Sequence, residues 1–262
     1  MNRLDRSFLR LRNGIPYFIN PELERLGWVI HGFLTRHGGV SALPFHSLNV
    51  GLNSGDKKEH ISKNLDLITH AFEFGERRLL LLNQMQEDGI LSIRTFNEPF
   101  SPFLPYDAMM TDVPNLVLGI KTADCLPILI VDIQKKVISA IHSGRQGTAL
   151  EITRKVLRKM KEEWGCSLEN LIVTLGPSIG SCCYEIDEKV FRREWEPFSI
   201  PTKPGRWKVD LTKINISQMI EEGVQESQIW RVDLCTCCHS NLFFSHRGEG
   251  RTGRQLSFIG MI

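Results

Sequence analysis

The sequence predicts an α/β fold, organised as a single three-layer α/β/α domain with a mixed sheet over residues 1–262. Short apolar segments of strand length recur along the chain, and amphipathic segments with helical periodicity lie between them. No Ser/Gly/Pro-rich tract, charge block or internal repeat interrupts this pattern, which favours one compact unit.

The predicted strands are short apolar segments. Several lack strict alternation of polar and apolar residues, as expected where both faces of a sheet are covered. In chain order they are residues 28–34, 79–82, 116–120, 128–131, 137–141, 171–175 and 229–234. Because helical segments alternate with these strands, we expect helices on both faces of the sheet.

The predicted helices are amphipathic. After Asp56, a candidate N-cap, apolar residues repeat at helical spacing until Gly75. A second helix is expected over residues 149–164, whose apolar residues fall on one face. Further helices are expected after Asp187 and after Asp210.

One long segment has no clear period. Residues 97–114 contain four of the twelve prolines, and their apolar residues follow neither strand nor helix spacing. We expect a surface loop there, and a candidate lid.

The composition argues against nucleic-acid and membrane partners. Lys and Arg number 32 against 30 Asp and Glu, so the net charge of +2 creates no basic field for a polyanion. Residues 1–12 lack the apolar run of a secretory signal, and no apolar stretch is long enough to span a membrane. Seven cysteines, an odd number, indicate reduced thiols and a cytoplasmic protein. The oligomeric state is not specified.

The first candidate site residues lie between two predicted strands. Asp124 and Cys125 separate the apolar runs 116–120 and 128–131, so one strand ends there and another begins. Such a break at the end of a sheet is a common position for a functional side chain. A buried structural cysteine is the alternative.

A histidine ends the next predicted strand. His142 is followed by a turn with glycines at Gly144 and Gly147, and this turn leads into the helix expected over 149–164. Glycines permit a ligand to approach the backbone, and a helix N-terminus offers N–H groups to an anion such as phosphate.

Cys125 and His142 together admit two kinds of chemistry. In the first, the histidine deprotonates the cysteine, which attacks an acyl group. In the second, both side chains bind zinc, and a third ligand completes a catalytic site with an open position for water. The spacing of the two residues does not distinguish these two chemistries, and it is equally compatible with a purely structural role.

Several motifs, taken together, resemble the laccase-domain family. They occur in the family's order and cover most of the chain. They are TRHGGVS (35–41), SLNVG (47–51), KTADCLP (121–127), GPSIG (176–180), YEID (184–187), FFSHR (243–247) and TGR (252–254). Members of this family carry the labels polyphenol oxidase, purine nucleoside phosphorylase with adenosine deaminase activity, and peptidoglycan editing factor.

The resemblance implies a zinc-dependent purine nucleoside phosphorylase. Its substrates would be phosphate and nucleosides such as adenosine, inosine, guanosine and methylthioadenosine, with adenosine deaminase as a further activity. The family's zinc ligands are a His, a Cys and a second His. Cys125 and His142 match two of them, and zinc is favoured over copper because the chain has no His-x-His pair for a multicopper site.

The third zinc ligand does not match. Gln86 stands where the family's Gln-Val-His motif has its histidine, and an amide oxygen binds zinc more weakly than imidazole does. The family's His-Ala-Gly-Trp-Arg-Gly is also altered, because Arg145 replaces its Trp and Gln146 its Arg.

The resemblance also implies supporting residues. Arg36, Arg145 and Arg247 are the candidate phosphate-binding residues, since guanidinium groups suit phosphate. Arg254 lies in a similar motif. Asp124 is the candidate catalytic partner that orients His142, with a turn-capping role as the alternative.

Three hypotheses therefore stand. The first is an active phosphorylase or deaminase in which Gln86, or another histidine such as His37, completes the zinc site. The second is a metal-free hydrolase that uses Cys125 and His142. The third is a binding protein that has kept the pocket and lost catalysis.

The remaining cysteines are interpreted as structural. Cys235-Thr-Cys-Cys-His239 contains a C-x-x-C, but the chain has no second C-x-x-C at zinc-ribbon spacing, and Cys235-Thr236 resembles a strand end of the family. The adjacent Cys182 and Cys183 are interpreted as local packing residues, with a redox role as the alternative.

Overall fold

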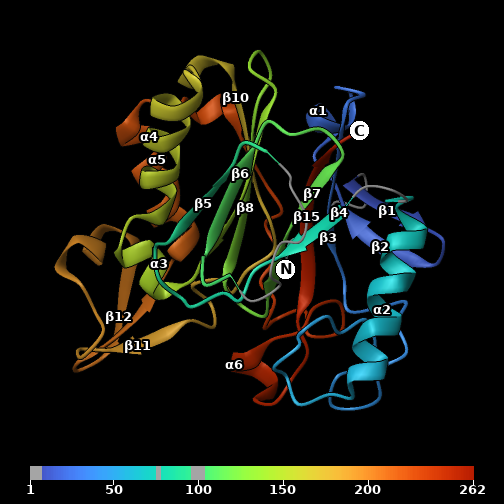
Figure 1. The fold of residues 1–262 in the computed structure, drawn as a ribbon. Coiled ribbons are helices and arrows are strands. Elements are labelled where there is room, and N and C mark those ends of the chain that lie inside the picture. Colours follow the sequence, from blue (N-terminus) through green and yellow to red (C-terminus); the bar gives the residue numbers. More distant parts are fainter. Residues whose placement is uncertain (1–7, 75–77, 96–103) are drawn as a thin grey trace.

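Two six-stranded mixed sheets form the centre of the molecule (Figure 1). They are seen in a computed structural model that describes residues 8–74, 78–95 and 104–262. In spatial order, the first sheet consists of β1 (Leu9–Arg12), β2 (Ile15–Phe18), β3 (Val29–Leu34), β15 (Gln255–Met261), β7 (Leu116–Thr122) and β4 (Arg78–Leu81). The second consists of β14 (Ile229–Arg231), β10 (Leu171–Leu175), β8 (Leu126–Asp132), β9 (Val137–Ser143), β6 (Ala108–Thr111) and β5 (Ile90–Ile93).

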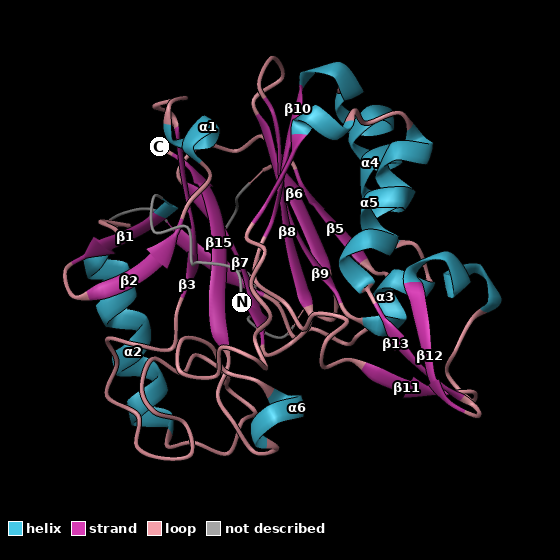
Figure 2. Cartoon of the chain, turned by 180° about the vertical axis from the view of Figure 1, so that it is seen from behind, coloured by secondary structure: helices cyan, strands magenta, loops and turns pink. Residues whose placement is uncertain are grey.

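Helices cover the outer face of each sheet (Figure 2). The helix α2 (Lys58–Ala71) packs on the first sheet, and α4 (Ile152–Trp164) and α5 (Leu211–Glu222) pack on the second. Shorter helices are α1 (Pro21–Glu24), α3 (Arg145–Ala149) and α6 (His246–Glu249). Three 3-10 turns cover Leu168–Asn170, Arg193–Phe198 and Glu226–Gln228, and a small third sheet joins β11 (Glu185–Asp187), β13 (Arg206–Val209) and β12 (Ser199–Lys203).

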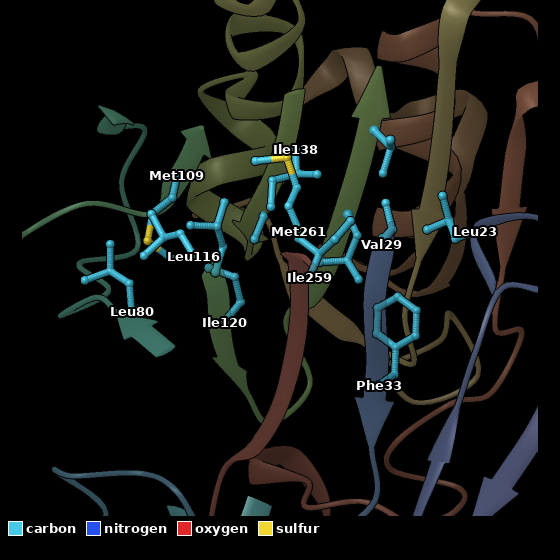
Figure 3. Close-up of a cluster of buried hydrophobic side chains, with 14 of the residues drawn as sticks. Leu23, Val29, Phe33, Leu80, Met109, Leu116, Ile120, Ile138, Ile259 and Met261 are labelled. Carbon is cyan, nitrogen blue, oxygen red and sulfur yellow. The ribbon is translucent and has the colours of Figure 1, made fainter. Parts of the chain in front are cut away.

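The predicted mixed α/β fold is confirmed, but its one sheet is in fact two. The inner faces of the two sheets bury a shared core, in which Leu116 and Ile259 of the first sheet pack with Ile138 of the second (Figure 3). Every residue of β8 and of β9 is buried, because one face meets the other sheet and the other face meets helices. An apolar run indicates that both faces are covered, and it does not indicate whether a helix or a sheet covers them.

All seven predicted strands are present, within one to three residues at their ends. The strand β15 was not predicted, although it pairs with both β3 and β7 in the middle of the first sheet. The strand β6 lies inside the predicted loop 97–114, so that interpretation was wrong for Ala108–Thr111. Residues 96–103, which include the first seven residues of the candidate lid, lie outside the described residues.

The predicted helices are confirmed with changes at their ends. The helix expected over 149–164 is α4, which begins only at Ile152 because Glu151 before it adopts a positive φ of 58°; the short helix α3 precedes it. The helix expected after Asp210 is α5, and the Asp210 carboxylate caps it by accepting a hydrogen bond from the Lys213 amide. After Asp187 a turn follows β11, and the helix that comes next is the 3-10 turn Arg193–Phe198 and not an α-helix. The helix α2 ends at Ala71, and Gly75 lies outside the described residues.

Among the described residues, no helix is long and apolar enough to cross a membrane.

A buried histidine connects three segments of the fold. The Nε2 atom of His31 in β3 accepts a hydrogen bond from the Asn20 amide at 2.8 Å. The Asn20 side chain caps α1 and donates to Thr174 of β10, in the other sheet, at 2.8 Å. Burial lowers the pKa of His31 to about 4, because a protonated ring in the interior has no water to stabilise its charge.

We therefore predict an acid-sensitive stability that depends on His31. Below the unfolded pKa of 6.5, the unfolded chain binds a proton that the folded protein resists down to about 4. The free energy of unfolding should then fall across this window, by about 2 to 3 kcal/mol when pH 4.5 is reached. Urea unfolding near pH 7 and pH 4.5 checks this, with His31→Gln as the non-titrating variant. Equal losses in both proteins would contradict the prediction.

Candidate functional site

A cavity of about 570 Å³ is lined by residues of α3 and α6 and of the loops between the strands. This volume is in the range of small-molecule sites. The helices α3 and α6 lie at the same end of the two sheets (Figure 1). Loops from both sheets line the cavity, and they bring together Cys125, His142, Gln86 and Asp124, all four of which the sequence predicted as site residues.

Cys125 lies where the chain passes from one sheet to the other. The strand β7 of the first sheet ends at Thr122, and β8 of the second sheet begins at Leu126. Asp124 takes a positive φ of 87° in this connection, which turns the chain sharply. The predicted break between two strands is therefore also the junction between the sheets.

The pairing of β8 with β9 places His142 beside Cys125. The two strands are antiparallel, and Pro127 lies opposite His142 in their register. The turn after His142 passes close to the thiol, because a Cβ atom on Gly144 would lie only 3.0 Å from Cys125 Sγ. A larger residue at this position would push on the sulfur, so glycine permits the approach.

A carboxylate that the sequence analysis missed holds the imidazole. Asp107 is completely buried, and its Oδ1 atom lies 2.7 Å from His142 Nδ1. The same carboxylate accepts hydrogen bonds from three consecutive amides, those of Met85, Gln86 and Glu87, at 2.9 to 3.0 Å. With Nδ1 occupied in this way, the Nε2 side of the ring is left for Cys125 or a ligand.

The charges of this group favour a protonated imidazole. Burial opposes protonation of His142, but the negative charge of the Cys125 thiolate and the hydrogen bond to Asp107 raise the pKa of His142 to about 9. Burial raises the pKa of Asp107, yet its hydrogen bonds from His142 and Glu87 bring that pKa below its ordinary value. The three side chains therefore form a thiol, imidazole and carboxylate series.

Asp124 does not orient His142, and that interpretation was wrong. Its carboxylate accepts hydrogen bonds from the Thr236 and Ser245 hydroxyls, both at 2.7 Å, and from the Arg247 amide. The alternative role, fixing the turn, is the one observed. Asp124 lines the cavity and binds two other loops to the junction between the sheets.

Four cationic side chains line the cavity. Arg145 is the first residue of α3, and Arg247 belongs to α6. Arg254 and Lys121 complete the set. Burial lowers the pKa of Lys121 to about 8, and its Nζ atom donates to the Leu82 carbonyl at 2.8 Å. This concentration of positive charge suits an anionic ligand.

Arg36 does not belong to the set, so its predicted role in phosphate binding is corrected. It is 7 % exposed, and its guanidinium forms an ion pair with Glu249 at 2.7 Å. It also donates to the carbonyls of His46 and Ser240. A guanidinium committed to these internal partners holds loops together and is absent from the cavity wall.

The histidine suggested as a substitute zinc ligand is also elsewhere. The Nε2 atom of His37 lies 2.6 Å from the Asn241 carbonyl, and His37 is not part of the cavity lining. His246 does line the cavity, with its Nδ1 atom 2.8 Å from the Gly250 carbonyl. His246 lies in the FFSHR motif, and no role was predicted for it from the sequence.

The donor set for zinc in the cavity is therefore incomplete. Cys125 and His142 supply a thiolate and an imidazole, and Asp107 orients the imidazole as carboxylates commonly do for zinc-bound histidines. Gln86 lines the same cavity and offers an amide. In the part of the chain that the structure describes, no third His, Cys, Asp or Glu donor lies within 4.8 Å of both.

A second group of sulfur atoms lies apart from Cys125. The Sγ atoms of Cys182, Cys183, Cys235 and Cys238 all fall within 4.8 Å of one another. The sequence analysis interpreted both pairs as structural because it looked for a second C-x-x-C. The partner of Cys235 and Cys238 is instead the adjacent pair Cys182 and Cys183, more than fifty residues earlier in the chain.

Residues 30–262 match the protein family described as multi-copper polyphenol oxidoreductase laccase. The chain is 31% identical to the purine nucleoside phosphorylase YlmD of Bacillus subtilis over 89% of this chain and 88% of that protein. It is 32% identical to YlmD of Geobacillus stearothermophilus, over 95% and 93% of the two chains. The crystal structure of the Bacillus licheniformis hypothetical protein YfiH covers 98% of this chain, with its own chain fully matched, a TM-score of 0.89 and 30% identity.

We predict that Asp107→Asn lowers the pKa of His142 and loosens the cavity wall. The amide carries no negative charge to stabilise the imidazolium, and its N–H₂ group, which replaces one of the two oxygens, cannot accept the hydrogen bonds made to that oxygen. The free energy of unfolding should fall by about 1 to 3 kcal/mol. NMR titration of the His142 ring in chelator-treated protein, with His142→Gln for assignment, measures the pKa. A midpoint that stays at the wild-type pH would contradict this prediction.

Proposed function

We propose that this chain, which belongs to the family described as multi-copper polyphenol oxidoreductase laccase, is a purine nucleoside phosphorylase. The observation that carries the proposal is one cavity that joins Cys125 and His142 to four cationic side chains. The names of the Bacillus and Geobacillus relatives, similar over nearly their whole length, point the same way. The proposed substrates are phosphate and adenosine, inosine, guanosine or methylthioadenosine.

The positive wall supports phosphate as the nucleophile. Arg145, Arg247 and Arg254 carry guanidinium groups, which bind phosphate oxygens with two parallel hydrogen bonds. Lys121 adds a charge that is lost as pH rises through about 8. In phosphorolysis, a phosphate oxygen bonds to the anomeric carbon of the ribose while the bond to the purine nitrogen breaks. The arginines would hold the phosphate for that attack.

The rest of the wall suits a nucleoside. Tyr184, Ile179 and Leu211 offer aromatic and apolar surface to a purine ring. The Arg247 guanidinium lies over the Tyr184 ring, 5.1 Å from its centre, and donates to the Glu185 carbonyl. The same cavity would hold adenosine for deamination, in which water replaces the amino group of the base as ammonia leaves.

Zinc fits this cavity only in part. Cys125 and His142 would hold the ion, and the amide oxygen of Gln86 would complete the set weakly. When bound, zinc would polarise a water molecule or help to orient phosphate. The buried carboxylate of Asp107 would keep His142 oriented for either purpose.

Cys125→Ser should reduce phosphate-dependent cleavage of inosine and adenosine by about a thousandfold or more, because a hydroxyl is a far weaker metal ligand than a thiolate. A coupled assay for free purine, with and without phosphate, measures the loss. Cys166→Ala is the matched control, since Cys166 is buried in the core under the second sheet and outside the cavity. Turnover that survives Cys125→Ser would refute the assignment.

Gln86→His should strengthen zinc binding by at least about tenfold, because it supplies the missing imidazole. Gln86 is exposed and has a φ of 60°, a conformation that histidine tolerates. Competition with a chelator measures the zinc affinity. The double variant Gln86→His/Cys125→Ser is the control, because zinc that it still binds does not depend on Cys125 and is subtracted. Equal affinities for wild type and Gln86→His would exclude position 86 from the metal site.

A metal-free hydrolase is the second candidate. It is favoured by the series from Cys125 through His142 to Asp107, which matches the nucleophile, base and orienting group of cysteine hydrolases. Iodoacetamide would then inactivate the chelator-treated protein rapidly near neutral pH. In Gln86→His supplied with zinc, the hydrolase activity would be lost, because the metal would occupy the thiolate. A protein that binds nucleoside and turns over none would instead be a binding member of the family.

A further inference from the structure

The strongest feature outside the cavity is the four-cysteine group, Cys182, Cys183, Cys235 and Cys238. Its Sγ atoms lie within 4.8 Å of one another, and Cys238 Sγ is 3.4 Å from both Cys182 Sγ and Cys183 Sγ. Cys182 and Cys238 are exposed, so a metal ion has access from solvent. We infer that these four cysteines bind one tetrahedral thiophilic ion, zinc, at a site separate from Cys125 and His142.

The spacing of the sulfur atoms fits a single ion. With Zn–S bonds of about 2.3 Å, the four sulfurs of a regular tetrahedron are about 3.8 Å apart. The observed separations need only small shifts to reach this value. An iron–sulfur cluster contains several metal atoms between its cysteines, and it requires a wider arrangement than this one.

The two loops that carry the cysteines are already fixed to each other. Ser178 and Cys235 form an isolated parallel β-bridge, and the Thr236 amide donates to the Ser178 carbonyl at 3.0 Å. The turn at Cys182 and Cys183 is closed by hydrogen bonds from the Cys183 and Tyr184 amides to the Gly180 carbonyl. The thiols therefore meet in a prepared site, which reduces the entropy that binding must overcome.

A neighbouring amide favours a thiolate at Cys235, whereas burial raises the thiol pKa of Cys182 and Cys183, so there the metal itself would have to displace the protons. The Gly180 amide donates to Cys235 Sγ at 3.2 Å, a contact of the kind that stabilises metal-bound sulfur. Arg247 donates to the Cys183 carbonyl at 3.5 Å and brings a positive charge near the group. Binding of Zn²⁺ would form four Zn–S bonds and release the thiol protons to solvent, with no change of oxidation state.

The ion would hold one wall of the cavity in place. Ile179 and Tyr184, which flank the cysteine turn, both line the cavity. Thr236, in the other loop, donates to Asp124 beside Cys125. A metal at the four cysteines would thus stabilise the wall without touching substrate, and the inference holds whether or not the proposed phosphorylase activity does.

The test is metal analysis of the full-length protein, purified without a tag under reducing conditions. We expect one zinc equivalent to survive in Cys125→Ser and to be lost in Cys182→Ser/Cys238→Ser. Cys237→Ser is the matched control, because Cys237 lies in the same loop but outside the group, and it should keep the metal. Cobalt substitution should give the strong visible absorption of a tetrahedral tetrathiolate in wild type, Cys125→Ser and Cys237→Ser, and not in Cys182→Ser/Cys238→Ser.

Two results would overturn the inference. One is an unchanged zinc content in Cys182→Ser/Cys238→Ser. The other is a reduced, zinc-supplied wild type that takes up no metal, or whose mass shows a Cys238 disulfide in place of an ion. Cys182→His is the control for misfolding, because histidine is also a zinc donor. It should keep the metal and a native circular dichroism spectrum, whereas Cys182→Ser should lose the metal.

Discussion

The buried carboxylate of Asp107 is the constraint on which the site depends. It accepts from His142 Nδ1 and from the amides of Met85, Gln86 and Glu87, so one side chain fixes the ring and the loop after β4 together. Burying a carboxylate costs free energy unless both of its oxygens accept hydrogen bonds. Here the imidazole and the three amides supply those hydrogen bonds. The orientation of His142 toward Cys125 follows from this arrangement.

The cavity exists because the chain changes sheets beside that carboxylate. The connection from β7 to β8 carries Cys125 across the gap, and Asp124 secures it to the Thr236 and Ser245 hydroxyls. Two aspartates thus perform complementary tasks. Asp107 positions the imidazole, while Asp124 positions the backbone next to the thiol and the α6 segment that carries Arg247.

The sequence was informative where structure is local. The apolar runs around 116–120 and 128–131 revealed the strand break, and the family motifs singled out Cys125 and His142. Asp107 was missed because its contact with His142 depends on the pairing of β6 with β9, which no local pattern encodes. The second sheet and the meeting of Cys182 with Cys238 were missed for the same reason, since both arise from long-range packing.

In the proposed zinc site, an amide at position 86 in place of a third strong ligand would change the balance between proton and metal at His142. The Cys125 thiolate and Asp107 raise the pKa of this histidine to about 9, so at neutral pH zinc must displace a proton from the ring. Three strong donors would offset that cost more fully than two donors and an amide. In the proposed zinc site, Gln86 would therefore weaken zinc in its competition with the proton on His142 and leave the Cys125 sulfur free to react more often. Zinc affinity and thiol reactivity at Cys125 should vary in opposite directions as position 86 changes.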